Sequence, residues 1–189
     1  MQYLINSNNW PSQFPYTPEA SVEVRNDHDV LYLTFSVCCK QLRALTVNDQ
    51  GPVWEDSCVE FFCRVPGEKH YMNFEANCIG AMVASRRLGR SEDVQPLPPQ
   101  EMQLITRRCS FPRQAIPEQD GLFSWQVELQ IPLRLIFRSA KPVFPQPLEV
   151  NFYKCADATR KPHYLSWQPI PVPAPDFHRP EYFGTIVLS

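Results

Sequence analysis

The stretch Trp125-Gln126-Val127-Glu128-Leu129-Gln130-Ile131 decides the fold, because every odd position is apolar and every even position is polar. Side chains alternate between the two faces of a β-strand, so this pattern predicts a strand with one buried face and one face in water. Prolines leave little room for helices elsewhere: the chain has 20 of them, and only residues 19–51 and 67–95 run longer than fourteen residues without one. The sequence therefore predicts an all-β protein.

Several other segments are rich in β-branched and aromatic residues, which favour strands. The predicted strands cover residues 22–24, 30–37, 58–65, 71–78, 103–109, 150–157, 164–167 and 182–188. One short helical turn is predicted at 132–137, where Pro132 can take the first position. Because turns rather than long helices separate the strands, we expect an antiparallel β-sandwich with jelly-roll-like or immunoglobulin-like layers, built as a single domain over residues 1–189.

Length, charge and hydropathy exclude several classes of protein. The 189 residues are 43% hydrophobic and 20% charged, which is typical of one globular domain. A net charge of −2 lacks the basic surface of a nucleic-acid-binding protein. No stretch approaches the roughly 20 apolar residues of a membrane helix, and the N-terminus lacks the features of a secretory signal. As written, the sequence predicts a cytoplasmic protein without nucleic-acid or membrane partners.

The seven cysteines are odd in number and lie mostly in strand-like runs, so we interpret them as reduced thiols of the core. They are Cys38, Cys39, Cys58, Cys63, Cys78, Cys109 and Cys155. Cys58 and Cys63 do not form a CxxC pair, and adjacent residues such as Cys38 and Cys39 point to opposite faces of a strand. The spacing therefore predicts neither zinc binding nor a redox dithiol, and no cofactor is expected.

Two of the predicted strands carry polar side chains on one face. Glu60 and Phe62 share a face of strand 58–65, which Trp54 precedes. Strand 71–78 aligns four side chains on one face: Tyr71, Asn73, Glu75 and Asn77. Carboxylates and amides beside an aromatic ring are suited to a polyhydroxylated ligand, because the polar groups bind hydroxyls while the ring stacks. The alternative is an ordinary solvent-facing row with Trp54 covering the core.

Lys154 and two proline-rich segments complete the candidate features. Lys154 follows Val150 and Phe152 on an otherwise apolar strand face, where it either contacts a ligand or extends outward to water. Segments 86–101 and 168–181 predict long surface loops. Proline restricts the backbone, so such loops can form a binding rim at a small entropic loss, although prolines also block edge pairing of a sheet.

The order of the motifs resembles the family 9 carbohydrate-binding modules and their DOMON-like relatives. The matching motifs are Trp54–Phe62, Tyr71–Gly80, Ile131–Leu133, Asn151–Asp157 and Phe177–Gly184, and together they cover most of the chain. The resemblance implies a β-sandwich that binds a mono- or oligosaccharide without catalysis, the best-known members holding a glycan chain end between two aromatic rings. It also makes a secreted or periplasmic location the alternative to the cytoplasm.

Carried over position by position, the resemblance implies a set of carbohydrate-binding residues. They are Trp54, Glu60, Glu75, Asn77, Lys154, Phe177 and Trp167. Trp54 is the first aromatic wall and Phe177 the second, with Trp167 in reserve although its strand end also fits core packing. Glu75 departs from the basic residue of the better-studied members, and Lys154 stands where they carry an amide.

Two other functions stay open at this point. A glycosidase needs two carboxyl groups about 5–9.5 Å apart, which Glu60 and Glu75 on neighbouring predicted strands could supply. A DOMON-like haem binder needs an axial pair of histidine or methionine ligands. Its candidates are His70, Met72, His163 and His178. A structural calcium ion, without EF-hand spacing, would be held by turn carboxylates. Its candidate ligands are Asp27, Asp29 and Asp49.

Overall fold

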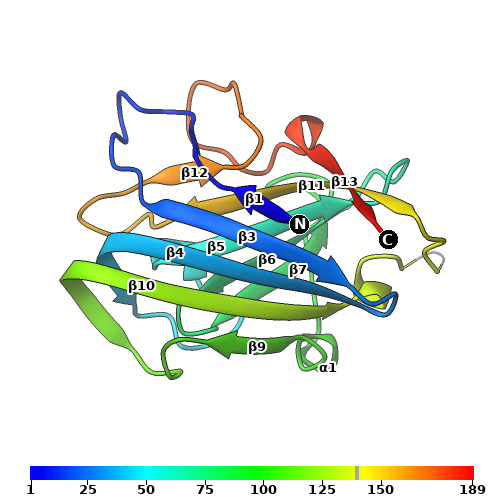
Figure 1. The fold of residues 1–189 in the computed structure, drawn as a ribbon, viewed down its shortest axis with the longest axis horizontal. Helices are drawn as coiled ribbons and strands as arrows, with labels where there is room; N and C mark the ends of the chain where they lie inside the picture. Colours follow the sequence, from blue (N-terminus) through cyan, green and yellow to red (C-terminus); the bar gives the residue numbers. More distant parts are fainter. Residues whose placement is uncertain (139–140) are drawn as a thin grey trace.

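The computed structural model describes residues 1–138 and 141–189 and forms two antiparallel β-sheets packed as a sandwich (Figure 1). The first sheet, here sheet A, has the strand order β1-β3-β4-β10-β9. Its strands are β1 Gln2–Leu4, β3 Glu19–Asn26, β4 Val30–Ala44, β9 Thr106–Cys109 and β10 Ile116–Pro132. The long strands β4 and β10 pair along most of their length and form the centre of sheet A.

The second sheet, here sheet B, has the order β2-β12-β11-β5-β6-β7-β8, and β13 also pairs with β11. Its strands are β2 Ser7–Asn8, β5 Cys58–Arg64, β6 Tyr71–Asn77, β7 Met82–Arg87, β8 Gln95–Pro96, β11 Gln146–Cys155, β12 Tyr164–Ser166 and β13 Gly184–Leu188. The helical segments are short: η1 Val53–Glu55, α1 Pro99–Met102, η2 Leu133–Leu135 and η3 Pro180–Tyr182. Among the described helices none is long and apolar enough to cross a membrane.

The core lies between the two sheets and confirms the alternation of the 125–131 segment. Trp125, Val127, Leu129 and Ile131 are all buried against sheet B. From sheet B, three phenylalanine rings on neighbouring strands stack along the same layer. Phe61 lies 5.9 Å from Phe74 and 5.6 Å from Phe152 between ring centroids. Residues of this parity on β5, β6 and β11 therefore face the core, and residues of the other parity face outward.

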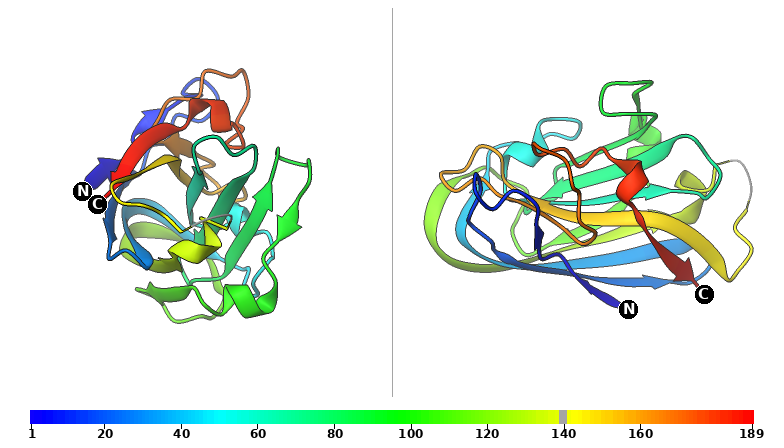
Figure 2. Two further views of the ribbon diagram at one scale, coloured as in Figure 1. Left: turned by 90° about the vertical axis from the view of Figure 1, so that its right-hand side faces the viewer. Right: turned by 90° about the horizontal axis from the view of Figure 1, so that it is seen from above.

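The outer face of sheet B is also covered, which is why strands β5 and β6 are buried along almost their whole length. A second apolar cluster, which includes Trp10, Phe62, Tyr71, Tyr153 and Phe177, lies over this face. Residues 168–183, here called the strap, and the N-terminal segment lie side by side there, since the Trp10 Nε1 donates a 2.7 Å hydrogen bond to the Val172 carbonyl. Figure 2 shows the two segments together at one edge of the molecule, in blue and in orange to red.

Most predicted strands are confirmed, and the differences have local causes. The strands at 22–24 and 30–37 extend to eight and fifteen residues, because β3 and β4 pair with each other and β4 continues along β10. Strand 103–109 shortens to β9, since α1 and its C-terminal turn occupy the residues before it. The expected turn at 132–137 is the 3-10 helix η2, with Pro132 just before its first residue. Strand β7 was not predicted.

The cysteines are all free, as expected of reduced thiols, and five of the seven are buried. Cys38 and Cys39 face opposite sides of β4: Cys39 belongs to the core cluster and Cys38 is half-buried. The predicted burial is therefore confirmed for five of the seven, and their reduced state stays a prediction.

Candidate functional site

A cavity of about 500 Å³ lies on the outer face of sheet B, beneath the strap. Carboxylates, guanidinium groups and aromatic rings converge on it. Its lining residues are Phe14, Trp54, Glu60, Glu75, Val83, Arg87, Arg90, Ser91, Cys155, Asp157, Tyr164, Pro175, Asp176, Phe177 and His178. Strand register explains the floor: Glu60 lies directly opposite Glu75 on β6 and Tyr153 on β11, and Glu75 lies opposite Val83 on β7. Four outward-facing strand positions thus form one surface.

A larger groove of about 840 Å³ runs along sheet A. Small and uncharged side chains such as Ser21, Ser36 and Ser124 make up much of its lining, and Glu19 is the single charged residue among the described residues that line it. A ligand site needs a few convergent polar groups in a concave surface. On this ground the smaller cavity on sheet B is the better candidate.

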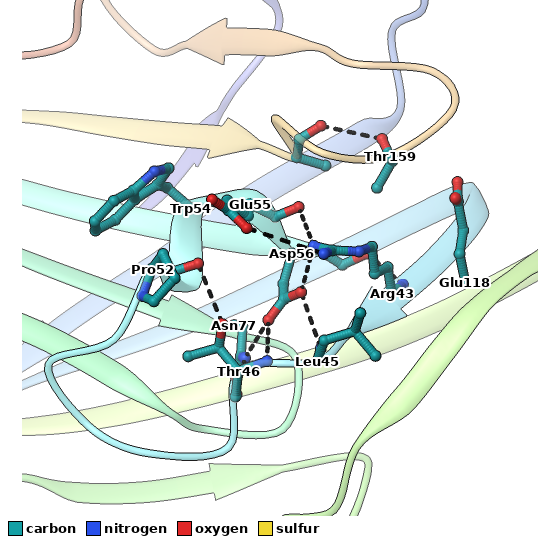
Figure 3. A network of polar contacts seen from close by, with 12 residues as sticks. Arg43, Leu45, Thr46, Pro52, Trp54, Glu55, Asp56, Asn77, Glu118 and Thr159 are labelled. Atoms are coloured by element: carbon teal, nitrogen blue, oxygen red, sulfur yellow. Dashed lines mark hydrogen bonds and ion pairs between the residues drawn. The ribbon is translucent and has the colours of Figure 1, made fainter.

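Trp54 reaches the cavity from the 3-10 turn η1, and a buried carboxylate holds that turn in place. The Asp56 carboxylate is fully buried and accepts hydrogen bonds from the Arg43 guanidinium at 2.7 Å and from the Leu45 and Thr46 backbone N–H groups at 2.9 Å each. In Figure 3 the Trp54 ring points away from this network. The ring is 40% exposed, unusual for a tryptophan, and is free to stack on a ligand.

Phe177 lines the same cavity but is mostly packed against protein. Its ring stacks on Tyr153 with centroids 4.2 Å apart and an angle of 10°, and only 8% of the residue is exposed. The Tyr153 hydroxyl also donates a 3.1 Å hydrogen bond to the Phe177 carbonyl. Phe14 and Tyr164, whose rings are 4.7 Å apart, are half-buried and line the cavity as well. Phe177 therefore offers a smaller stacking surface than Trp54.

The two glutamates at the floor are buried and have perturbed pKa values. Burial, together with the Cys155 thiol and the Glu75 carboxyl, raises the pKa of Glu60 well above its usual range. Burial raises the pKa of Glu75 to about 7, while the Asn73 amide and the Arg87 guanidinium act in the opposite direction. Burial thus favours the protonated form of both carboxyl groups, and a protonated carboxyl group can both donate and accept hydrogen bonds.

A chain of hydrogen bonds orients Glu75. The Asn73 amide donates to Glu75 Oε1 at 2.8 Å, and the Ser85 hydroxyl donates to Asn73 Oδ1 at 2.7 Å. Arg87 donates to the Ser85 hydroxyl through Nε at 3.1 Å. Every residue of this network lies on the outer face of β6 or β7. The network therefore holds the Glu75 carboxyl group from the strand side and leaves the side that faces the cavity available to a ligand.

Two of the sequence-predicted residues, Asn77 and Trp167, lie outside this cavity. Asn77 donates hydrogen bonds to the Thr46 carbonyl at 2.8 Å and to Asp56 at 2.9 Å, so it supports the η1 turn (Figure 3). Trp167 packs against Tyr3 and Phe152 at the core, which is the alternative that its strand end suggested. Neither side chain is positioned to contact a ligand in the cavity.

Lys154 is also placed away from the cavity, for a reason of strand parity. It follows Phe152, whose ring faces the core, and it is fully buried between the sheets. Its ammonium group donates to the Cys155 carbonyl at 2.6 Å, contacts His163 Nε2 at 2.9 Å and lies 5.8 Å from the centre of the Trp125 ring. Burial lowers the pKa of Lys154. A charge on an apolar strand face here extends inward to partners, not outward to water.

The candidate haem ligands occupy different environments. His70 bonds to Asp93 at 2.7 Å, Met72 lies in the core, and His163 contacts Lys154. His178 lines the cavity and hydrogen-bonds the Tyr71 hydroxyl at 2.9 Å. Among these four residues the structure brings no pair together across the cavity.

Two of the three candidate calcium ligands, Asp27 and Asp49, are engaged by protein donors. Asp49 bonds to Arg107 at 2.7 Å and to Arg113 at 2.5 Å, and Asp27 accepts from the Val30 backbone at 2.9 Å and from the Tyr32 hydroxyl at 2.5 Å. Neither carboxylate stands ready to coordinate a cation.

Sequence reasoning missed several residues of the cavity wall. They are Phe14, Arg87, Arg90, Asp157, Tyr164, Asp176 and His178. Two of them could have been found from the alternation of faces along a strand. Asp157 lies on the same face as Tyr153 and Cys155, and Arg87 lies on the same face as Val83 and Ser85. The others lie on or near the ends of loops whose path over the sheet no local pattern specifies.

Comparisons with known proteins agree with this architecture. The family model described as carbohydrate-binding family 9 matches residues 1–188. A crystal structure of a proposed carbohydrate-binding protein from Bacteroides uniformis superposes with a TM-score of 0.94 at 32% identity, covering 100% of this chain and 86% of that chain. No curated protein sequence matches the chain.

Two further structures share the fold at low identity. Both are of a family 9 carbohydrate-binding module from Caldicellulosiruptor kristjanssonii. The complex with glucose has a TM-score of 0.58 at 14% identity, covering 97% of this chain and 84% of that chain. The complex with cellotriose has a TM-score of 0.59 at 14% identity, covering 100% and 82%. Given the family match over nearly the whole sequence, the chain belongs to carbohydrate-binding family 9.

Proposed function

We propose that this protein binds a sugar in the cavity on the outer face of sheet B, with Trp54 stacking on the ring and Glu60, Glu75 and Arg87 binding its hydroxyls. One observation carries the proposal: a 40% exposed tryptophan and two buried carboxyl groups line a single cavity of about 500 Å³. That volume lies within the range of about 300–1,000 Å³ that is usual for small-ligand sites.

The polar groups suit neutral, polyhydroxylated ligands. Glu60, Glu75 and Asp157 are matched by Arg87 and Arg90 in the same wall, so the cavity presents both donors and acceptors. Burial raises the pKa of Asp157 to about 6, and its carboxyl group adds a further acceptor. A mixed set of this kind satisfies hydroxyl groups, each of which donates one hydrogen bond and accepts up to two. Phe177 contributes one packed ring edge to the rim and Tyr164 a second aromatic surface.

Isothermal titration calorimetry with glucose, cellotriose and a panel of neutral oligosaccharides tests the proposal. Stacking on one aromatic ring is worth about 1–3 kcal/mol if the scale for bases on aromatic rings holds, so Trp54→Ala should weaken binding by about 5- to 150-fold. The matched control is Leu122→Ala, which removes a 78% exposed apolar side chain on sheet A. Equal affinity of Trp54→Ala and wild type, with native circular dichroism, contradicts the stacking role.

Glycoside hydrolysis is the second candidate, and one observation favours it. Glu60 and Glu75 lie directly opposite one another on β5 and β6, and both line the cavity. Opposed residues on antiparallel strands have Cβ atoms about 4.5–5.5 Å apart, compatible with the carboxyl separation of a retaining glycosidase. Turnover of aryl glycosides that is lost in Glu75→Gln would establish hydrolysis. A binding function without hydrolysis predicts no turnover above the buffer rate for either protein.

A further inference from the structure

Two cysteines and a glutamate from neighbouring strands meet at the floor of the cavity, which Cys155 and Glu60 line. Cys58 on β5 is the register partner of Cys155 on β11, and Glu60 follows Cys58 on the same face of β5. The two Sγ atoms and one Glu60 carboxylate oxygen all lie within 4.8 Å of one another. The Cys155 thiol donates to Glu60 Oε1 at 3.0 Å. All three side chains are buried.

The hydrogen bond from the Cys155 thiol is a weak partner for the buried Glu60 carboxyl group. A thiol is a weak hydrogen-bond donor, while a buried carboxyl group needs strong partners. The Cys155 sulfur also lies 3.6 Å from the Trp54 carbonyl oxygen, which is an acceptor, and it contacts the Cys58 thiol. Three acidic or nucleophilic groups therefore face each other in a space where a cation would satisfy all of them.

The geometry points to a zinc-type metal site, and we propose that Cys58, Cys155 and Glu60 bind one Zn²⁺ ion. Thiolate ligands select zinc and other soft ions over calcium and magnesium. With Zn–S bonds of about 2.3 Å and Zn–O bonds of about 2.1 Å, tetrahedral ligand atoms lie about 3.6–3.8 Å apart.

The surroundings complete the site. Cys155 and Glu60 line the cavity, so the fourth coordination position of the metal faces the cavity and is available to water or a ligand oxygen. Burial raises the pKa of Cys58 to about 12 and the pKa of Cys155 well above its usual range, while the Lys154 ammonium, bonded to the Cys155 carbonyl at 2.6 Å, acts in the opposite direction. It partly offsets the negative charge of two thiolates and one carboxylate.

Sequence spacing could not show this site. Its ligands come from neighbouring strands and include two cysteines 97 positions apart, whereas zinc motifs are recognised by short intervals between ligands. The metal site shares Glu60 with the proposed sugar site, but its two thiol ligands are not assigned to the sugar and its test uses no sugar.

Titration of the reduced, full-length protein with Co²⁺ tests the site. Cobalt replaces zinc in such sites and reports thiolate ligation by a charge-transfer band and tetrahedral geometry by its visible bands. We expect one Co²⁺ per chain, with both sets of bands, and loss of the bands when Zn²⁺ is added. Cys58→Ser and Cys155→Ser should each lower the charge-transfer intensity by about half and weaken binding at least about tenfold. Glu60→Gln should weaken binding but keep the thiolate band.

Cys63→Ala is the matched control, because Cys63 lies on the same strand, is equally buried and faces the core. It should bind Co²⁺ like wild type. Circular dichroism checks that each variant is folded. Absence of a thiolate band in reduced wild-type protein overturns the proposal, and so does a band that survives in the folded Cys58→Ser/Cys155→Ser double variant. Sugar affinity measured in the same samples is a separate readout, so failure of either proposal is recognised on its own.

Discussion

At the scale of single residues, strand parity decides what each polar side chain does. Glu60 and Glu75 have outward parity and reach the cavity, whereas Lys154 has the parity of Phe152 and lies between the sheets. Asn77 shows that parity alone is insufficient. It lies on the outward face but beneath the η1 turn, where it bonds to Asp56 instead of a ligand.

Substitution of Lys154 tests whether its side chain acts in the core or on a ligand in the cavity. Because its side chain contacts Cys155, His163 and Trp125 in the core and not the cavity, Lys154→Met should leave the affinity for any bound sugar within about twofold of wild type. Calorimetry on metal-free protein measures this. Glu75→Gln is the comparison that should weaken binding. A tenfold loss in folded Lys154→Met would mean that the lysine acts on the ligand.

Asp56 gives a stability prediction at the same scale. Asp56→Ala leaves the Arg43 guanidinium and two backbone N–H groups without their hydrogen-bond acceptor. Breaking a buried ion pair in this way lowers the free energy of unfolding by about 3–5 kcal/mol. Urea unfolding measures the loss. The neighbouring Glu55→Ala, whose contact with Arg43 is 4.0 Å long and partly exposed, should cost less than about 1 kcal/mol. Similar losses in both variants would refute the role of Asp56.

At the scale of elements, the strap of residues 168–183 closes the cavity because specific bonds hold it. Tyr153 binds the Phe177 carbonyl, and Trp10 binds the Val172 carbonyl. Trp10→Phe removes the second bond, worth about 1 kcal/mol, so hydrogen exchange at 170–174 should accelerate about fivefold while exchange in the core strands is unchanged. Tyr32→Phe on sheet A is the control. Unaltered exchange in the strap would show that packing alone fixes it.

The strands also show which parts of the fold and of the cavity can be predicted from the sequence. The alternation at 125–131 and the aromatic runs at 58–65 and 71–78 predict their strands, because each face has one consistent environment. Strand β7 was missed, since Met82–Arg87 mixes small, apolar and basic residues, and Arg87 was missed with it. Phe14 reaches the cavity through a loop path, and the Cys58–Cys155 pairing depends on strand order. Neither feature has a local signal.

At the scale of the whole molecule, two sheets share one core over the chain. The single domain predicted from length implies one cooperative transition. Scanning calorimetry of the metal-free protein should therefore show a single peak whose calorimetric and van't Hoff enthalpies agree within about 10%. Two resolved peaks in metal-free protein would mean that the sheets or the strap unfold independently.

The most direct test of the central claim is an NMR titration that follows the indole N–H signals of the four tryptophans as sugar is added. Trp54 lines the cavity on sheet B, and Trp125 lines the groove along sheet A. Sugar binding in the cavity on sheet B should give a saturable shift of the Trp54 signal and leave the Trp125 and Trp167 signals unmoved. A shift of Trp125 without Trp54, or no shift with glucose, cellotriose or any neutral glycan of the panel, would contradict it.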